Sequence, residues 1–111
     1  MNATKETIVY NITFKVRWDI QEEWLAWQKK EHITAIMATG LFDEYRIFRL
    51  LEQDEEEGPT YIIQYFTASL DRYRQFMIGF APDLQRISRD KWGDGFIAFR
   101  TLMTTDMGAG K

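Results

Sequence analysis

The sequence predicts an α+β domain whose elements follow the order β-α-β-β-α-β. The prediction rests on a first segment that alternates apolar and polar residues, two segments with helical spacing, and further runs rich in aromatic and β-branched residues. The chain has 111 residues, the length of one domain, and can form a core without disulfides, a metal ion or a partner. It contains no cysteine, which excludes disulfides, thiolate metal sites and cysteine nucleophiles.

The first strand is predicted over residues 8–16, where apolar side chains occupy every second position. A helix is expected from about residue 20 to residue 38. Asp19, with Glu22 three residues later, has the spacing of a capping box, which predicts Asp19 as the N-cap. The helix should end at Thr39-Gly40, because glycine readily adopts the left-handed conformation that closes a helix.

The second and third strands are predicted over residues 41–52 and 60–67, joined by an acidic hairpin loop. Ser69 is the expected N-cap of a second helix. Pro82 should interrupt that helix, because proline lacks an amide hydrogen and its ring collides with the preceding turn. After the helix resumes and ends at residues 93–95, the last strand is expected over residues 96–103.

This order is that of the ferredoxin-like split βαβ motif, with two helices on one face of a four-stranded antiparallel sheet. The third and fourth strands are apolar on both sides of the pleat, so the second face of the sheet also needs a cover. The sequence therefore predicts a homodimer formed through the sheet faces. We expect a flexible N-terminus over residues 1–7, one domain over residues 8–104 and a flexible tail over residues 105–111.

Several blocks of the sequence, considered together, carry a resemblance that spans about residues 8–103. They are Tyr10-Asn11-Ile12-Thr13, residues 24–32, Ala38-Thr39-Gly40-Leu41-Phe42, Gln64-Tyr65-Phe66, Phe80-Ala81-Pro82 with Leu84-Gln85, and Phe96 with Ala98-Phe99-Arg100-Thr101. The combination resembles a bacterial family of short proteins known only as a domain of unknown function. The resemblance implies a ferredoxin-like fold of the dimeric α+β-barrel kind and implies no activity. Relatives by fold include cofactor-free oxygenases, small isomerases, haem-degrading enzymes and stress-related proteins, so the fold does not choose a function.

Charge and hydropathy exclude several partners. The 14 basic and 17 acidic side chains give a net charge of -3, which argues against nonspecific nucleic-acid binding. No apolar stretch approaches the ~20 residues of a membrane span, and the N-terminal segment lacks the apolar run of a signal peptide. We therefore expect a cytoplasmic protein with no nucleic-acid partner and no membrane partner.

His32 is the first candidate for chemistry, because the pKa of imidazole suits proton transfer near neutrality. On a helical wheel, Gln28, Glu31 and His32 fall inside the apolar arc of the first helix. These side chains either point toward a cavity between helix and sheet or are structural groups with satisfied hydrogen bonds. His32 and Glu31 are the catalytic candidates, and Gln28 and His32 are candidates for ligand binding.

Gln64 and Arg100 are polar residues within otherwise apolar strands, and both are further candidates for ligand binding. A guanidinium in such a place would orient a carboxylate, an enolate or a phosphate. Either residue could instead bond across a dimer interface, where arginine is favoured. The four tryptophans are more typical of a core than of a cofactor pocket. With one histidine and no cysteine, we expect no metal site and no cofactor, although haem ligation by His32 stays open.

Two function classes remain at this point. The first is a homodimeric protein that binds a small organic ligand between helices and sheet, as a cofactor-free enzyme would. The second is a noncatalytic homodimeric interaction or regulatory module, in which the same polar groups only satisfy hydrogen bonds. A cavity onto which two or more of Glu31, His32, Gln64 and Arg100 converge would favour the first class. A filled core would favour the second.

Overall fold

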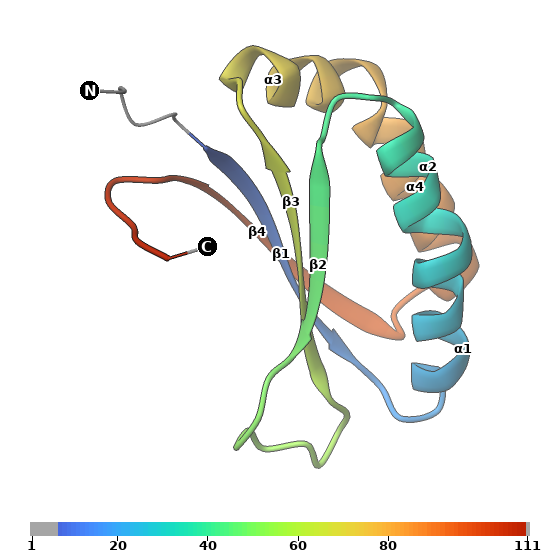
Figure 1. The fold of residues 1–111 in the computed structure, drawn as a ribbon. Coiled ribbons are helices and arrows are strands. Elements are labelled where there is room, and N and C mark those ends of the chain that lie inside the picture. The colour runs from blue at the N-terminus through green and yellow to red at the C-terminus, as the bar shows by residue number, and fades with distance from the viewer. Residues whose placement is uncertain (1–6, 111) are drawn as a thin grey trace.

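A computed structural model describes residues 7–110 of the chain. One antiparallel sheet is formed by β1 (Ile8–Val16), β2 (Glu44–Arg49), β3 (Thr60–Thr67) and β4 (Phe96–Thr104), in the order β2-β3-β1-β4. The helices lie on one side of this sheet (Figure 1). The ferredoxin-like α+β fold is therefore confirmed, and the predicted bounds of the first and third strands agree with β1 and β3.

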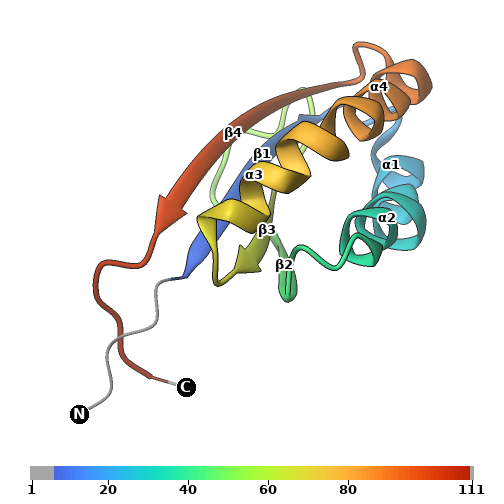
Figure 2. The ribbon, with the colours of Figure 1, turned by 90° about the horizontal axis from the view of Figure 1, so that it is seen from above.

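The helical layer consists of two interrupted helices. The first comprises α1 (Gln21–Trp27), a π-helical turn η1 (Gln28–His32) and α2 (Ile33–Ala38). The second comprises α3 (Leu70–Gly79) and α4 (Ala81–Trp92). Figure 2 shows α3 and α4 following one another along the sheet, with α1 and α2 beside them. No helix within residues 7–110 is long and apolar enough to span a membrane.

Local chemistry sets most of the helix ends as predicted. The Ser69 hydroxyl accepts hydrogen bonds from the amides of Asp71 and Arg72, at 3.1 and 3.4 Å, and so caps α3. The break between α3 and α4 lies at Phe80, which leaves Pro82 in the first turn of α4, where its missing amide hydrogen costs nothing. Gly93 has a φ of 56° and ends α4.

Two local predictions are wrong. The N-cap of α1 is Ile20, not Asp19, because the Arg17 guanidinium binds both carboxylate oxygens of Asp19 at 2.7 and 3.0 Å. The second strand is also shorter than residues 41–52. It ends at Arg49, and three residues later the chain turns through Glu52, whose φ is 57°.

The core lies between the sheet and the helices and is rich in aromatic residues. Trp24 is fully buried and packs against Phe14 and Tyr61, with ring centroids 5.0 and 5.8 Å apart. Trp27 is also buried, as predicted for a core tryptophan. For Trp18 the prediction of a core position is wrong: this side chain is 49% exposed, and its indole N–H donates to the Glu55 carbonyl at 2.7 Å.

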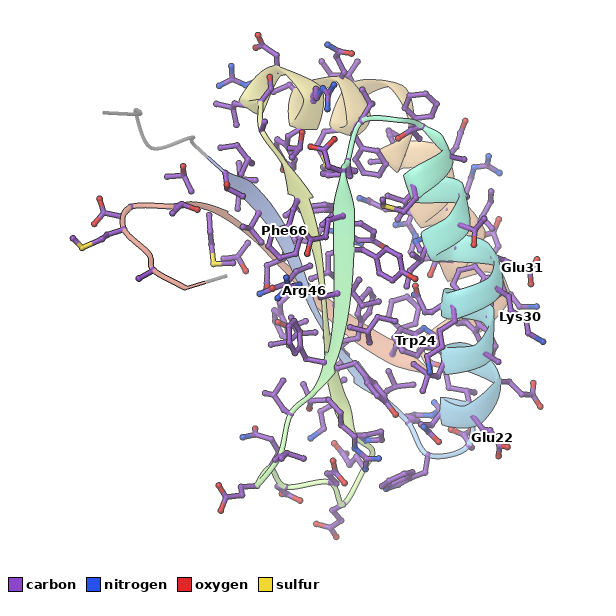
Figure 3. The ribbon with its side chains drawn as sticks, viewed as in Figure 1. Glu22, Trp24, Lys30, Glu31, Arg46 and Phe66 are labelled. Carbon is purple, nitrogen blue, oxygen red and sulfur yellow. The ribbon has the colours of Figure 1, made fainter. Side chains whose placement is uncertain are left out.

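The opposite face of the sheet, which we call the outer face, has a polar centre and an apolar border. Arg46 lies over the Phe66 ring on this side, with 5.6 Å between the guanidinium carbon and the ring centroid (Figure 3). The exposed apolar side chains here are Phe48, Ile97, Phe99 and Met103. This agrees with the predicted apolar character of the third and fourth strands. The predicted N-terminal segment lies outside the described residues except for Thr7, and Lys111 of the predicted tail also lies outside them.

Candidate functional site

A cavity of about 240 Å³, which we call the helix–sheet cavity, lies between α4 and the strands β1 and β4. The two strands form its floor, α4 forms one wall, and single residues of η1, α2 and α3 complete it. Apolar side chains such as Ile12, Phe76 and Phe96 supply much of its surface. Its polar lining residues are Tyr10, His32, Gln85, Ser88, Arg89 and Arg100.

Strand pairing places Arg100 beside Tyr10. Arg100 pairs with Ile12 across the β1–β4 ladder, and Tyr10 occupies the next position on the same face. Side chains two residues apart point to the same side of a strand, so both face the helices. The Arg100 Nε donates a hydrogen bond to the Tyr10 hydroxyl at 3.2 Å. This contact joins residues that are 90 positions apart in the sequence.

The Tyr10 hydroxyl remains protonated at neutral pH. Burial is the main cause, and it raises the pKa of Tyr10 although the charge and hydrogen bond of Arg100 and a hydrogen bond with Gln85 act in the opposite direction. A protonated phenol can donate its own hydrogen while it accepts one from Arg100. Tyr10 is therefore a neutral donor in the cavity.

His32 lies in η1 and is partly buried against the cavity. Its ring stacks on Trp27 with 4.8 Å between centroids, and Trp27 in turn packs edge-on against Trp92. Burial, together with the positive charge of Arg100, lowers the pKa of His32 from 6.5 to about 4. His32 is consequently neutral near pH 7, and one of its ring nitrogens is a hydrogen-bond acceptor.

The π-helical turn explains why the helical wheel misplaced Glu31. The amide of Ile33 donates to the Gln28 carbonyl, which is the five-residue spacing of a π-helix. A wheel drawn at 100° per residue fails across such a turn. The structure places Glu31 on the exposed side of the helix, pointing away from the sheet (Figure 3). Glu31 therefore does not line the helix–sheet cavity.

Gln28 is buried and is not part of the lining of the cavity. Its side chain is 0% exposed, and both its amide nitrogen and its amide oxygen lack a hydrogen-bond partner among residues 7–110. The indole nitrogen of Trp24, one helical turn earlier, also lacks one. Such groups are uncommon in folded proteins, and π-turns recur at functional positions. Gln28, predicted as a ligand-binding residue, does not border the cavity.

The structure separates Gln64 from the other candidates. Gln64 lies on the outer face, where its amide nitrogen donates to the Asn11 side-chain oxygen at 3.1 Å. Asn11 in turn donates to the Thr101 hydroxyl at 3.4 Å. This network satisfies Gln64 within the sheet, on the face away from the cavity. Convergence of two or more of four candidates was to favour a ligand cavity, and two of the four, His32 and Arg100, line it.

Sequence reasoning missed four of the polar lining residues: Tyr10, Gln85, Ser88 and Arg89. Ser88 lies four residues after Leu84, on the side of α4 that faces the sheet, so its helical spacing was a usable signal. Tyr10 gave no such signal, because it follows the apolar alternation of the first strand. Its role emerges only from its contact with Arg100.

Metal and haem fit this site poorly. Within the described residues, no group of three or more histidine or acidic side chains is arranged to hold a metal ion. The cavity volume is also below the roughly 300–1,000 Å³ of pockets for drug-sized ligands, so it does not fit a haem at His32.

A second recess, of about 520 Å³, lies at the end of the sheet near Trp18. It is larger, but its arginine, Arg17, already forms ion pairs with Asp19 and Asp94. The helix–sheet cavity is the stronger candidate because its polar groups come from four separate elements and surround an apolar space.

Several solved structures share the fold. A variant of SnoaB from Streptomyces nogalater, described as a cofactor-independent oxygenase, matches with a TM-score of 0.65 at 14% identity, over 97% of this chain and 100% of that chain. A NIPSNAP family protein from Agrobacterium tumefaciens matches with a TM-score of 0.65 at 19% identity, over 97% and 94%. A dimeric ferredoxin-like protein from an uncultured marine organism matches with a TM-score of 0.60 at 8% identity, over 94% and 98%. Identities this low show the fold alone.

The sequence itself identifies a family. A search of curated proteins found no match. Residues 7–105, by contrast, match the family described as a domain of unknown function, DUF4286. This match covers nearly the whole chain and confirms the resemblance seen in the sequence. The protein is therefore a member of the DUF4286 family, with a ferredoxin-like fold.

Proposed function

We propose that the protein binds a small organic ligand in the helix–sheet cavity. One observation carries the proposal: Tyr10, His32 and Arg100, from three different elements, border one largely apolar cavity. A concave apolar space with a few convergent polar groups is the usual form of a small-molecule site. Arg100 also has donors to spare, since its Nε alone is engaged with Tyr10.

The same three groups support acid–base chemistry without a cofactor. A neutral imidazole accepts a proton from a bound ligand, and a nearby guanidinium stabilises the anion that remains. In the free protein, a pKa of about 4 makes His32 a weak base. Negative charge that develops on the ligand beside His32 raises this pKa and strengthens the base when the ligand reacts. A fold neighbour described as a cofactor-independent oxygenase is consistent with chemistry of this kind.

A cavity-filling variant tests ligand binding. Ala98 lies on the cavity floor, so Ala98→Phe should fill the space, whereas Ala26→Phe places the same ring on the exposed side of α1. Benzoate, benzamide and phenol are single-ring probes for a cavity of this size. In amide NMR spectra we expect at least one probe to shift signals of β1, β4 and α4 in the wild type and in Ala26→Phe. We expect Ala98→Phe to lose those shifts.

Two results would contradict ligand binding at this site. The first is that no probe shifts those signals in the wild type. The second is that Ala98→Phe responds as the wild type does.

We also propose that two copies associate through the outer face. Phe99 is 65% exposed at the centre of β4, and a fold neighbour is described as dimeric. An exposed apolar surface of this kind commonly marks an interface. Phe99→Asp should convert the dimer to a monomer in light scattering coupled to gel filtration. Ile78→Asp, a matched change on the exposed side of α3, should leave the dimer intact. A wild-type monomer would contradict the proposal.

A further inference from the structure

The charges that line the helix–sheet cavity are all of one sign. Arg89 and Arg100 both line it, and none of its lining residues is acidic. Elsewhere in the described chain, five arginines form ion pairs with nearby carboxylates. They are Arg17, Arg46, Arg49, Arg72 and Arg86. Arg74, Arg89 and Arg100 form no ion pair within residues 7–110, although the chain has more acidic than basic side chains, and of these three only Arg89 and Arg100 line the cavity.

From this we propose that the ligand of the cavity is a small organic acid, bound as its carboxylate, with Arg100 as the principal anchor and Arg89 as a second cation. This inference rests on the proposed ligand-binding function and names the chemical class of the ligand. A guanidinium matches a carboxylate in shape and donates two parallel hydrogen bonds to it. An apolar body of about one ring would fill the rest of the space, given its volume of about 240 Å³.

The orientation of Arg100 supports its role as the anchor. Its Nε is engaged with the Tyr10 hydroxyl at 3.2 Å, a contact that restricts the guanidinium and leaves the terminal nitrogens for a ligand. Tyr10 is buried and neutral, so it holds Arg100 without cancelling its charge. Both arginines are exposed residues, so solvent weakens the attraction of each, and Arg100 is the anchor because its contact with Tyr10 restricts it.

The remaining groups around the cavity do not neutralise these cations. His32 is uncharged near pH 7, and the positive charge of Arg100 is one cause of its lowered pKa. Asp83, on α4, is already paired with Arg86 at 3.2 Å. An acidic ligand would therefore supply the negative charge that the lining residues lack.

Benzoate and benzamide provide the test, because they have almost the same size and differ in charge. In calorimetric titrations at pH 7 we expect the wild type to bind benzoate about tenfold or more tightly than benzamide, which is the value of one charge-assisted pair. Arg100→Met should lower benzoate affinity by about the same factor and change benzamide affinity little. Arg89→Met should have a smaller effect. Arg74→Met, on the exposed side of α3, should have none.

The outcomes separate this inference from the proposed function. Binding of benzamide as tight as that of benzoate, at a site that Ala98→Phe abolishes, would overturn the carboxylate inference and leave the ligand cavity standing. Failure of benzoate, benzamide and phenol to bind the wild type would overturn both proposals, whereas binding of phenol alone would overturn only the carboxylate inference. The wild-type comparison does not depend on the folding of any variant. Arg100→Lys keeps the positive charge but not the planar guanidinium that donates two parallel hydrogen bonds, so it should retain a reduced preference for benzoate. Loss of all preference in this variant would contradict a charge effect.

Discussion

The two faces of the sheet use the same residue types in opposite ways. On the outer face, Gln64, Asn11 and Thr101 bond to one another, and the apolar side chains around them are exposed. On the helix-facing side, aromatic side chains such as Tyr10 and Phe14 are buried, and Arg100 borders a cavity that contains no acidic partner. The type of a polar residue within an apolar strand therefore does not indicate whether it is structural or binds a ligand. What separates a structural amide from a candidate ligand anchor is whether the sheet itself satisfies the group.

The largest expected difference between the faces concerns Phe14 and Phe99. Phe14 is 4% exposed on the helix-facing side, and Phe14→Ala should lower the free energy of unfolding by about 3–5 kcal/mol through lost burial and a residual cavity. Phe99→Ala should cost less, and its effect should depend on protein concentration because Phe99 lies on the face that we propose as the dimer interface. Chemical denaturation at two protein concentrations measures both. Equal losses from the two substitutions would remove the contrast between the faces.

On the cavity side, we expect a smaller effect from His32, which should make the free energy of unfolding depend on pH. Its folded pKa of about 4 lies below the ordinary 6.5, so between these values the unfolded chain binds more protons than the native protein. The contribution of His32 to the free energy of unfolding is therefore fully present above pH 6.5 and decreases as the pH falls toward 4. Between pH 7 and pH 5 the loss from this one group should be roughly 2 kcal/mol. His32→Gln is the control, because glutamine does not titrate, and parallel stability curves for the two proteins would contradict the assignment.

The smallest expected effect lies on the outer face. Gln64→Ala removes the amide that bonds to Asn11 at 3.1 Å and should lower the free energy of unfolding by about 1 kcal/mol. It should leave benzoate binding unchanged, since Gln64 does not border the cavity. Denaturation and calorimetric titration of the same variant test both points. A loss of benzoate affinity comparable with that of Arg100→Met would mean that the two faces do not act independently.

The candidate site could be predicted only in part. His32 and Arg100 were found because a histidine on an apolar arc and an arginine in an apolar strand break the surrounding pattern. Glu31 broke the pattern as well, and the π-turn moved it to the exposed surface. Nothing in a single sequence distinguishes Gln64 from Arg100. Its position on the outer face depends on strand pairing, since a shift of one residue reverses the face of every side chain.

The sequence by itself determined the order of the elements, the extent of β1 and β3, and the helix ends at Thr39-Gly40, Pro82 and Gly93. These features follow from local chemistry: apolar spacing, the fixed ring of proline and the freedom of glycine at positive φ. The tertiary structure decided the contact of Arg100 with Tyr10, the placement of His32 over the cavity and the all-positive charge of the lining. Each of these depends on residues that lie far apart in the chain, which only packing brings together.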